Sequence, residues 1–122
     1  MRKSKYRACR FHGELNCPWC RKWRKTFNYF KKRNCSELRL YCVDLEHYRT
    51  GERFYKIGLT SGTVEERFDE DMERFKLIVI AEQVLPMYEA VTNETRLLHK
   101  FHKEGRLYRP KARISGFTEC FR

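Results

Sequence analysis

The feature that most constrains the fold of this chain is the stretch from Leu38 to Phe68. It contains RLYCVDL, the polar loop HYRTGER, and then FYKIGLT and SGTVEERF. Two segments rich in aromatic and branched residues flank a loop that contains Thr50-Gly51, which is a hairpin signal. The sequence therefore predicts strands at 38–45 and 53–59.

The expected hairpin brings a few chemically active side chains together. With the loop centred near Tyr48–Arg49, Tyr41 falls opposite Lys56. Side chains alternate between the two faces of a strand. One face would carry Tyr41, Lys56 and Gly58, and the other Tyr55, Ile57 and Leu59. Gly58 leaves room for another group to approach the backbone.

A helix is expected to follow the hairpin directly. Thr63-Val-Glu-Glu66 is a capping box, and the helix would run to about Phe75. Its buried stripe would be Val64, Phe68, Met72 and Phe75. Arg67 lies beside this stripe, and we expect it close to Gly58, so a tyrosine, a lysine and an arginine would share one patch. A solvated sheet face is an equally good interpretation of that patch.

The second half of the chain supplies a carboxylate. Residues 77–85 (LIVIAEQVL) form a nearly continuous apolar run, which predicts a well-buried strand. Pro86 would then start a helix that runs to about Glu104. Glu94 lies on the apolar stripe of this helix, where a charge is costly unless it is paired or metal-bound. It is a site candidate, with a buried Glu–Arg pair as the structural alternative. His99 and His102 are interpreted as surface or phosphate-contacting residues.

Positive charge is concentrated at the start of the chain. Residues 1–39 hold 13 of the 27 Lys and Arg against two acids, Glu14 and Glu37, whereas the remainder is charge-balanced. This asymmetry favours a basic nucleic-acid-binding segment ahead of a catalytic or structural domain, and nucleic acid over a membrane as partner. No apolar run is long enough for a spanning helix, and charge follows Met1, so we expect an intracellular, cytoplasmic protein.

The basic segment also contains a candidate zinc site. Cys9, His12, Cys17 and Cys20 follow the spacing C-x2-H-x4-C-x2-C. Four Cys and His donors suit tetrahedral zinc, and Gly13 and Pro18 suit the turns of a zinc knuckle. The alternatives are coincidence and a redox C-x-x-C pair, although a redox pair normally opens a helix after a buried strand.

A basic helix is expected after the zinc knuckle, over 21–33. Trp23, Phe27 and Phe30 follow helical spacing and are interpreted as core. The cations would bind phosphate with strong salt dependence. They are Arg21, Lys22, Arg24, Lys25, Lys31, Lys32 and Arg33. We expect residues 1–36 to form a basic zinc-knuckle element and 37–122 a second domain.

Several of these motifs resemble the GIY-YIG nuclease superfamily. The resemblance rests on Leu40-Tyr41-Cys42, Lys56-Ile57-Gly58, Thr60, Arg67 and Glu94-Thr-Arg-Leu97-Leu98. The closing Gly116-Phe-Thr-Glu119-Cys-Phe and the zinc knuckle resemble the phage-type, homing-endonuclease branch. The sequence departs from the pattern in two places. Arg39-Leu40 stands where the first motif has Gly-Ile, and Lys56 stands where the second has tyrosine.

The resemblance implies an α+β fold, with a three-stranded antiparallel sheet flanked by helices, and a Mg²⁺-dependent DNA endonuclease. Tyr41 would take a proton from the attacking water, Glu94 would hold Mg²⁺, and Arg67 would stabilise charge on the phosphate. Lys56 beside Tyr41 would lower the pKa of its phenol, and Glu119 is a further acid near the site. If the protein is phage-encoded, it would act in the host cytoplasm.

Two other functions stay open at this point. One is a nucleic-acid-binding module that has lost activity along with its second tyrosine. The other is a zinc-centred protein-interaction adaptor, which leaves Glu94 and the basic segment unexplained. The DNA target, the biological role and the oligomeric state do not follow from the sequence.

Overall fold

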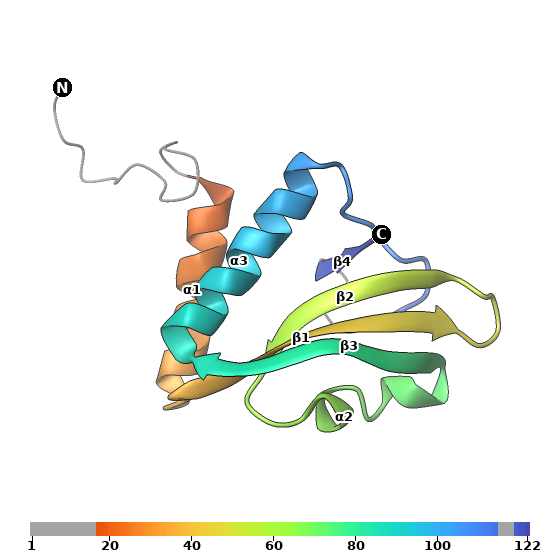
Figure 1. Cartoon of the computed structure of the whole chain (residues 1–122), viewed down its shortest axis with the longest axis horizontal. Helices are drawn as coiled ribbons and strands as arrows, with labels where there is room; N and C mark the ends of the chain where they lie inside the picture. Colours follow the sequence, from red (N-terminus) through yellow and green to blue (C-terminus); the bar gives the residue numbers. More distant parts are fainter. Residues whose placement is uncertain (1–16, 115–118) are drawn as a thin grey trace, which may run out of the picture.

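The computed structural model describes residues 17–114 and 119–122, which form a mixed α+β structure (Figure 1). In chain order its elements are helix α1 (Pro18–Lys32), strands β1 (Glu37–His47) and β2 (Arg53–Thr60), helix α2 (Val64–Arg67), a 3-10 turn η1 (Asp71–Glu73), strand β3 (Phe75–Pro86), helix α3 (Met87–Lys103) and strand β4 (Cys120–Phe121). The α+β class and the antiparallel sheet are confirmed. The expected count of three strands is wrong for these residues, because β4 adds a fourth strand and gives the order β3-β1-β2-β4.

The hairpin of β1 and β2 forms, but its register differs from the expected one. Tyr41 pairs with Gly58, and Lys56 pairs with Val43. The turn is centred one residue later than expected, because Gly51 adopts a left-handed φ of 75° and donates its N–H to the carbonyl of His47 at 2.9 Å. The pairing partner moves by two positions, so every side chain keeps its predicted face. Tyr41, Lys56 and Gly58 therefore do share one face.

Strand β3 is not the well-buried strand that its apolar run predicts. It forms one edge of the sheet and pairs only with β1 among the described strands. Ile78, Ile80 and Val84 are each about half exposed, at 48%, 53% and 48%. The pairing register shifts between Cys42 and Val43 of β1, where Ile80 is skipped, and this marks a bulge at Ile80 in β3. Bulges interrupt the regular ladder and are one way to blunt an exposed edge strand.

The helix expected over 63–75 is wrong in length. The capping box forms as predicted, with the Thr63 hydroxyl accepting from the Glu66 N–H at 3.1 Å. Helix α2 nevertheless ends at Arg67, and Asp71 opens the short η1 turn. Continuing the helix would place the acids at 69–71 near its negative C-terminal end. Asp71 instead pairs with Arg74 at 2.8 Å.

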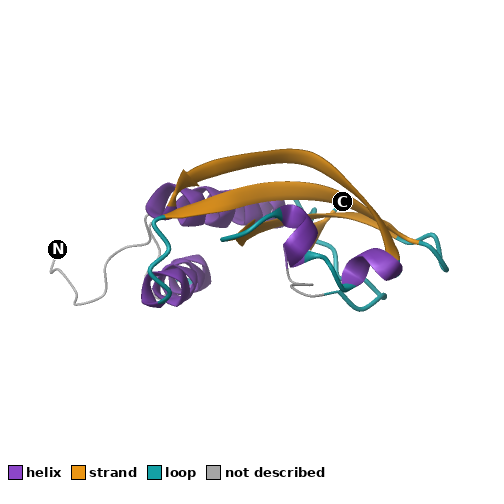
Figure 2. Ribbon diagram, turned by 90° about the horizontal axis from the view of Figure 1, so that it is seen from below, coloured by secondary structure: helices purple, strands orange, loops and turns teal. Residues whose placement is uncertain are grey.

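The two long helices lie side by side at one end of the sheet (Figure 1). Seen edge-on, the strands form one arched layer, with α1 beneath one end and α2 and η1 beneath the other (Figure 2). The stripe of Trp23, Phe27 and Phe30 packs against the core at Leu38 and Val91, as expected. The Trp23 indole N–H donates to the Thr92 hydroxyl at 3.0 Å, which fixes α1 on α3. None of the helices in the described part of the chain is long and apolar enough to cross a membrane.

Candidate functional site

Helix α3 carries Glu94 into the interior, as its spacing predicts. Ala90, Val91 and Leu98 are buried on the same side of the helix, and Glu94 is only 2% exposed. Its Oε1 atom has no hydrogen-bond partner among the described residues. Burial raises the pKa of Glu94 to about 8, and the nearby charge of Glu119 adds to the rise. Without a metal, Glu94 therefore keeps its proton near neutral pH.

Glu119 joins three elements at the site. Its Oε1 accepts from the buried ammonium of Lys56 on β2 at 3.0 Å, and its Oε2 accepts from Lys22 on α1 at 3.3 Å. Burial disfavours its charge, but the two ammonium groups hold the pKa of Glu119 below its usual value. The carboxyl groups of Glu119 and Glu94 also lie within hydrogen-bonding reach of each other. One buried acid, one ionised acid and two lysines thus form a single cluster.

Tyr41 lies against Gly58, directly across the hairpin. A Cβ atom at Gly58 would lie 2.7 Å from Cζ of the Tyr41 ring, which is too close for any side chain. The phenol is 2% exposed, and its ring meets Phe68 edge-on with the centroids 5.5 Å apart. Residue 58 must therefore be glycine, because the Tyr41 ring occupies the space that any side chain would need.

The pKa of Tyr41 differs from expectation. Burial raises the pKa of its phenol well above the ordinary value, and the charges of Glu119 and Glu94 add to this, whereas Arg67 lowers it. Lys56 does not act as the expected activator, because its ammonium is paired with Glu119 and lies 6.0 Å from the centre of the Tyr41 ring. Arg67 is the cation that influences the phenol.

Arg67 connects this cluster to a large hollow on the surface. It lines a cavity of about 940 Å³ between α2, η1 and the segment 109–114. Four further cations line the cavity, namely Arg74, Arg109, Lys111 and Arg113. The Glu52 carboxylate helps to hold this segment, accepting from the backbone N–H groups of Lys111 and Ala112 at 2.8 and 2.9 Å. The cavity also has acidic walls, so the cations are not its only charges.

The expected zinc site lies only partly within the described residues, because Cys9 and His12 fall outside them. Cys17 caps α1, where its sulfur accepts the Trp19 N–H at 3.3 Å, and Cys20 lies in the first turn. The Cys17–Cys20 pair thus opens a helix, which both the zinc and the redox interpretations allow. Of the two histidines on α3, His99 and His102, each has its ring within 5.6 Å of the Trp19 ring.

The buried carboxylates are compatible with a divalent metal ion. Mg²⁺ is commonly held by one or two carboxylates, with water and substrate phosphate completing its shell. Glu94 and Glu119 supply two such groups, and Oε1 of Glu94 has no hydrogen-bond partner among the described residues. No larger cluster of His, Cys, Asp or Glu that could hold a metal occurs within 17–114 and 119–122.

Sequence reasoning missed one member of the cluster and underrated another. The sequence predicts Lys22 as one of the phosphate-binding cations, whereas in the structure its ammonium pairs with Glu119. Its position three residues after Trp19, on the border of the apolar stripe, was the available signal. Glu119 is central here because β4 places it beside Lys56, and a strand of two residues gives almost no sequence signal.

The site thus brings two carboxyl groups, two lysines and the Tyr41 phenol close together, with Arg67 at the border of the cavity. Compared with models of known families, with curated proteins and with solved structures, the chain matches none. Functional inference therefore depends on the residues of the site themselves.

Proposed function

We propose that this protein is a metal-dependent endonuclease that hydrolyses phosphodiester bonds in DNA. The observation that carries the proposal is Glu94, a buried acid whose Oε1 lacks a partner among the described residues and which lies beside Glu119. Burying such a group costs free energy, and that cost is commonly accepted at functional sites. The resemblance of the surrounding motifs to GIY-YIG nucleases supports the same conclusion.

Mg²⁺ at Glu94, with Glu119 as a second carboxylate, would neutralise negative charge on the scissile phosphate and on the leaving oxygen. Arg67 lies at the border between the buried cluster and the open cavity. From there its guanidinium is suited to stabilising the charge that develops on the phosphate. Lys56 would hold Glu119 in its ionised form, because the fully buried Lys56 ammonium donates a charge-assisted hydrogen bond to the Glu119 carboxylate.

Tyr41 is the proposed general base. Its phenol holds a proton at neutral pH in the metal-free protein, because burial and two carboxyl groups raise its pKa. With both carboxylates holding the cation, their charges would no longer raise the pKa of Tyr41, whereas the charge of Arg67 would still lower it. The Tyr41 phenol would then release its own proton to solvent more readily, and the resulting phenolate would accept a proton from the attacking water.

The basic face of α1 is the proposed DNA-binding surface. The helix carries seven Lys and Arg between residues 21 and 33 together with its capping residue, and no acid in its first turn. Phosphate contacts from such cations give affinity that falls steeply with salt. The zinc knuckle, if the quartet of Cys9, His12, Cys17 and Cys20 binds metal, would brace the start of this helix.

The role of Tyr41 gives a direct test of this function. We expect the wild type to cut an end-labelled DNA duplex in Mg²⁺ and not in EDTA. Tyr41→Phe should lower the single-turnover rate about 10²-fold or more, since general bases contribute that much. Its affinity for DNA in Ca²⁺ should stay the same. Tyr48→Phe is the matched control, because Tyr48 is 66% exposed in the hairpin loop. Equal rates for both variants would contradict the role of Tyr41.

A catalytically inactive DNA-binding module is the second candidate. It is favoured by Lys56, which replaces a motif tyrosine and is fully buried in an ion pair with Glu119. In this alternative the lysines stabilise the cluster permanently and no metal enters. It predicts salt-dependent DNA binding without any cleavage in Mg²⁺.

A further inference from the structure

Helix α1 contributes a side chain to the carboxylate cluster, although it precedes the sheet and the motifs of the site. Lys22 Nζ lies 3.3 Å from Oε2 of Glu119, and the two residues are 97 positions apart in the chain. The helix is held in this position by the Trp23–Thr92 hydrogen bond and by the edge-on ring contacts of Trp23 and Phe27 with Tyr88 of α3. The contact therefore belongs to the packed fold.

The two lysines that share Glu119 differ in their surroundings. Lys56 has a side chain that is 0% exposed, and it extends from a strand that is paired on both sides. Lys22 has a side chain that is 29% exposed, and it extends from the surface of a helix. An ammonium in contact with water can leave its partner at low cost, whereas a fully buried one that leaves its carboxylate remains as an uncompensated buried charge. Only Lys22 is free to exchange.

We propose that Lys22 is an exchangeable counter-ion of the reaction site, which a divalent metal ion displaces from Glu119. This inference rests on the proposed nuclease function, since it concerns the same carboxylates. In the metal-free protein the Lys22 ammonium occupies the solvent side of Glu119, where a cation would approach. Lys56 stays on the other oxygen and keeps the carboxylate in place.

Once it leaves Glu119, the Lys22 side chain can turn into a neighbouring groove. A groove of about 520 Å³ runs along α1, and Lys22 lines it together with Arg21, Lys25 and Tyr29. The ligand that suits this groove is a phosphate of the bound strand, next to the one being cut, because ammonium groups bind phosphate as point charges. Metal binding would thus turn Lys22 from a partner of Glu119 into a contact with DNA. In this way α1 couples metal loading to substrate binding.

Metal titration without DNA tests the exchange. Mn²⁺ binding is measured by the loss of free-ion EPR signal for wild type, Lys22→Met and Lys25→Met, and Glu94→Gln marks the binding that belongs to this site. Lys25 lines the same groove about one turn further along, so its variant removes the same charge from the same helix. We expect Lys22→Met to bind Mn²⁺ about three- to tenfold more tightly, because a competing cation is gone. Lys25→Met should match the wild type. Equal affinities for the two variants, or weaker binding by Lys22→Met, would overturn the proposal.

A measurement on the wild type covers the case in which Lys22→Met does not fold. The ammonium ¹⁵N signals of Lys22 and Lys56 are followed by NMR while Ca²⁺ is added. The exchange predicts that the protected Lys22 signal disappears and that the Lys56 signal persists. If both signals persist at saturating Ca²⁺, the exchange does not occur.

The contact with DNA has its own signature. Removing one phosphate contact lowers the slope of log K against log[salt] by about 0.9. Lys22→Met should show this loss in Ca²⁺ and not in EDTA, whereas Lys25→Met should show the same slope in both. An equal loss in both conditions for Lys22→Met would overturn the coupling. Because none of these measurements uses cleavage, a protein that exchanges Lys22 but cuts no DNA would refute only the nuclease function.

Discussion

Replacing Glu94 by glutamine removes the ionisable group from the centre of the cluster and keeps its shape. In the metal-free protein burial raises the pKa of Glu94 from 4.5 to about 8. The native state then binds a proton that the unfolded chain releases, so stability falls as pH rises between these two values. The amide of Glu94→Gln has no proton to lose. We therefore expect the wild type, and not the variant, to lose stability across this window.

The size of the effect follows from the two pKa values. Between pH 5 and pH 8 a single group with these values would cost roughly 3 to 4 kcal/mol of stability, because each pH unit is worth about 1.4 kcal/mol. This is an upper bound, because the proton is partly shared with Glu119. The pKa of Glu119 is lowered, so its own contribution is lost only at more acidic pH and does not enter the window. A difference of about 2 kcal/mol is the expected outcome.

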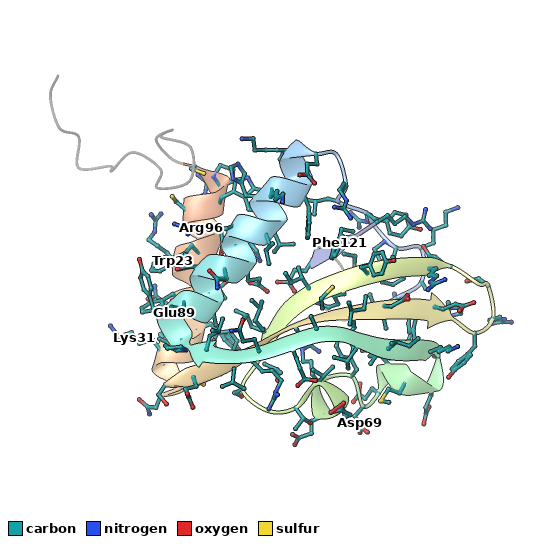
Figure 3. The ribbon with its side chains drawn as sticks, in the orientation of Figure 1. Trp23, Lys31, Asp69, Glu89, Arg96 and Phe121 are labelled. Carbon is teal, nitrogen blue, oxygen red and sulfur yellow. The ribbon has the colours of Figure 1, made fainter. Side chains whose placement is uncertain are left out.

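Urea unfolding in EDTA at pH 5 and pH 8 measures this difference, and the change with pH is compared between wild type and Glu94→Gln. Contributions from all other groups are common to both proteins and cancel in this comparison. Glu89→Gln is the control, because Glu89 lies on the same helix at an exposed position (Figure 3). Mg²⁺ should restore stability at pH 8 to the wild type and to Glu89→Gln only. The same pH dependence in all three proteins would refute the assignment of a buried, protonated Glu94.

Three further changes probe the frame around the cluster. Gly58→Ala should destabilise the fold by about 2 kcal/mol in urea unfolding, because the added carbon collides with the buried ring of Tyr41; a neutral effect would mean that the ring lies elsewhere. Trp23→Phe removes the hydrogen bond to Thr92 and should cost about 1 kcal/mol by the same assay, and no change would show that α1 is not fixed through this bond. Lys31→Met, on the exposed end of α1, should lower the salt slope of DNA binding by about 0.9 in fluorescence anisotropy titrations, and an unchanged slope would remove this end of the helix from the DNA interface.

Local patterns predicted the elements that build the site. Alternation along the hairpin placed Tyr41, Lys56 and Gly58 on one face, and helical spacing placed Glu94 inward on α3. These predictions succeed because a side chain's face depends only on the period of its own element. The predicted partner of Tyr41 across the hairpin is wrong, because the pairing depends on where Gly51 turns the chain.

The features that sequence reasoning missed depend on long-range packing. The apolar run of β3 predicted burial, but its place at the edge of the sheet leaves Ile78 and Ile80 half exposed. The pairing of Lys22 and Lys56 with Glu119 joins residues from α1, β2 and the end of the chain. Periodicity within one element carries no information about such contacts. The pKa of Tyr41 was misjudged for the same reason, because the partner of Lys56 was unknown.

Supercoiled plasmid conversion is the most direct test of the proposed nuclease. Wild type, Glu94→Gln and Glu89→Gln are compared in Mg²⁺ and in EDTA, from preparations purified in parallel. The account predicts Mg²⁺-dependent nicking or linearisation by wild type and by Glu89→Gln, and no conversion by Glu94→Gln. Conversion by Glu94→Gln at the wild-type rate would contradict it. So would a wild type that shifts DNA in a gel but never cuts it, which is the behaviour of an inactive binding module.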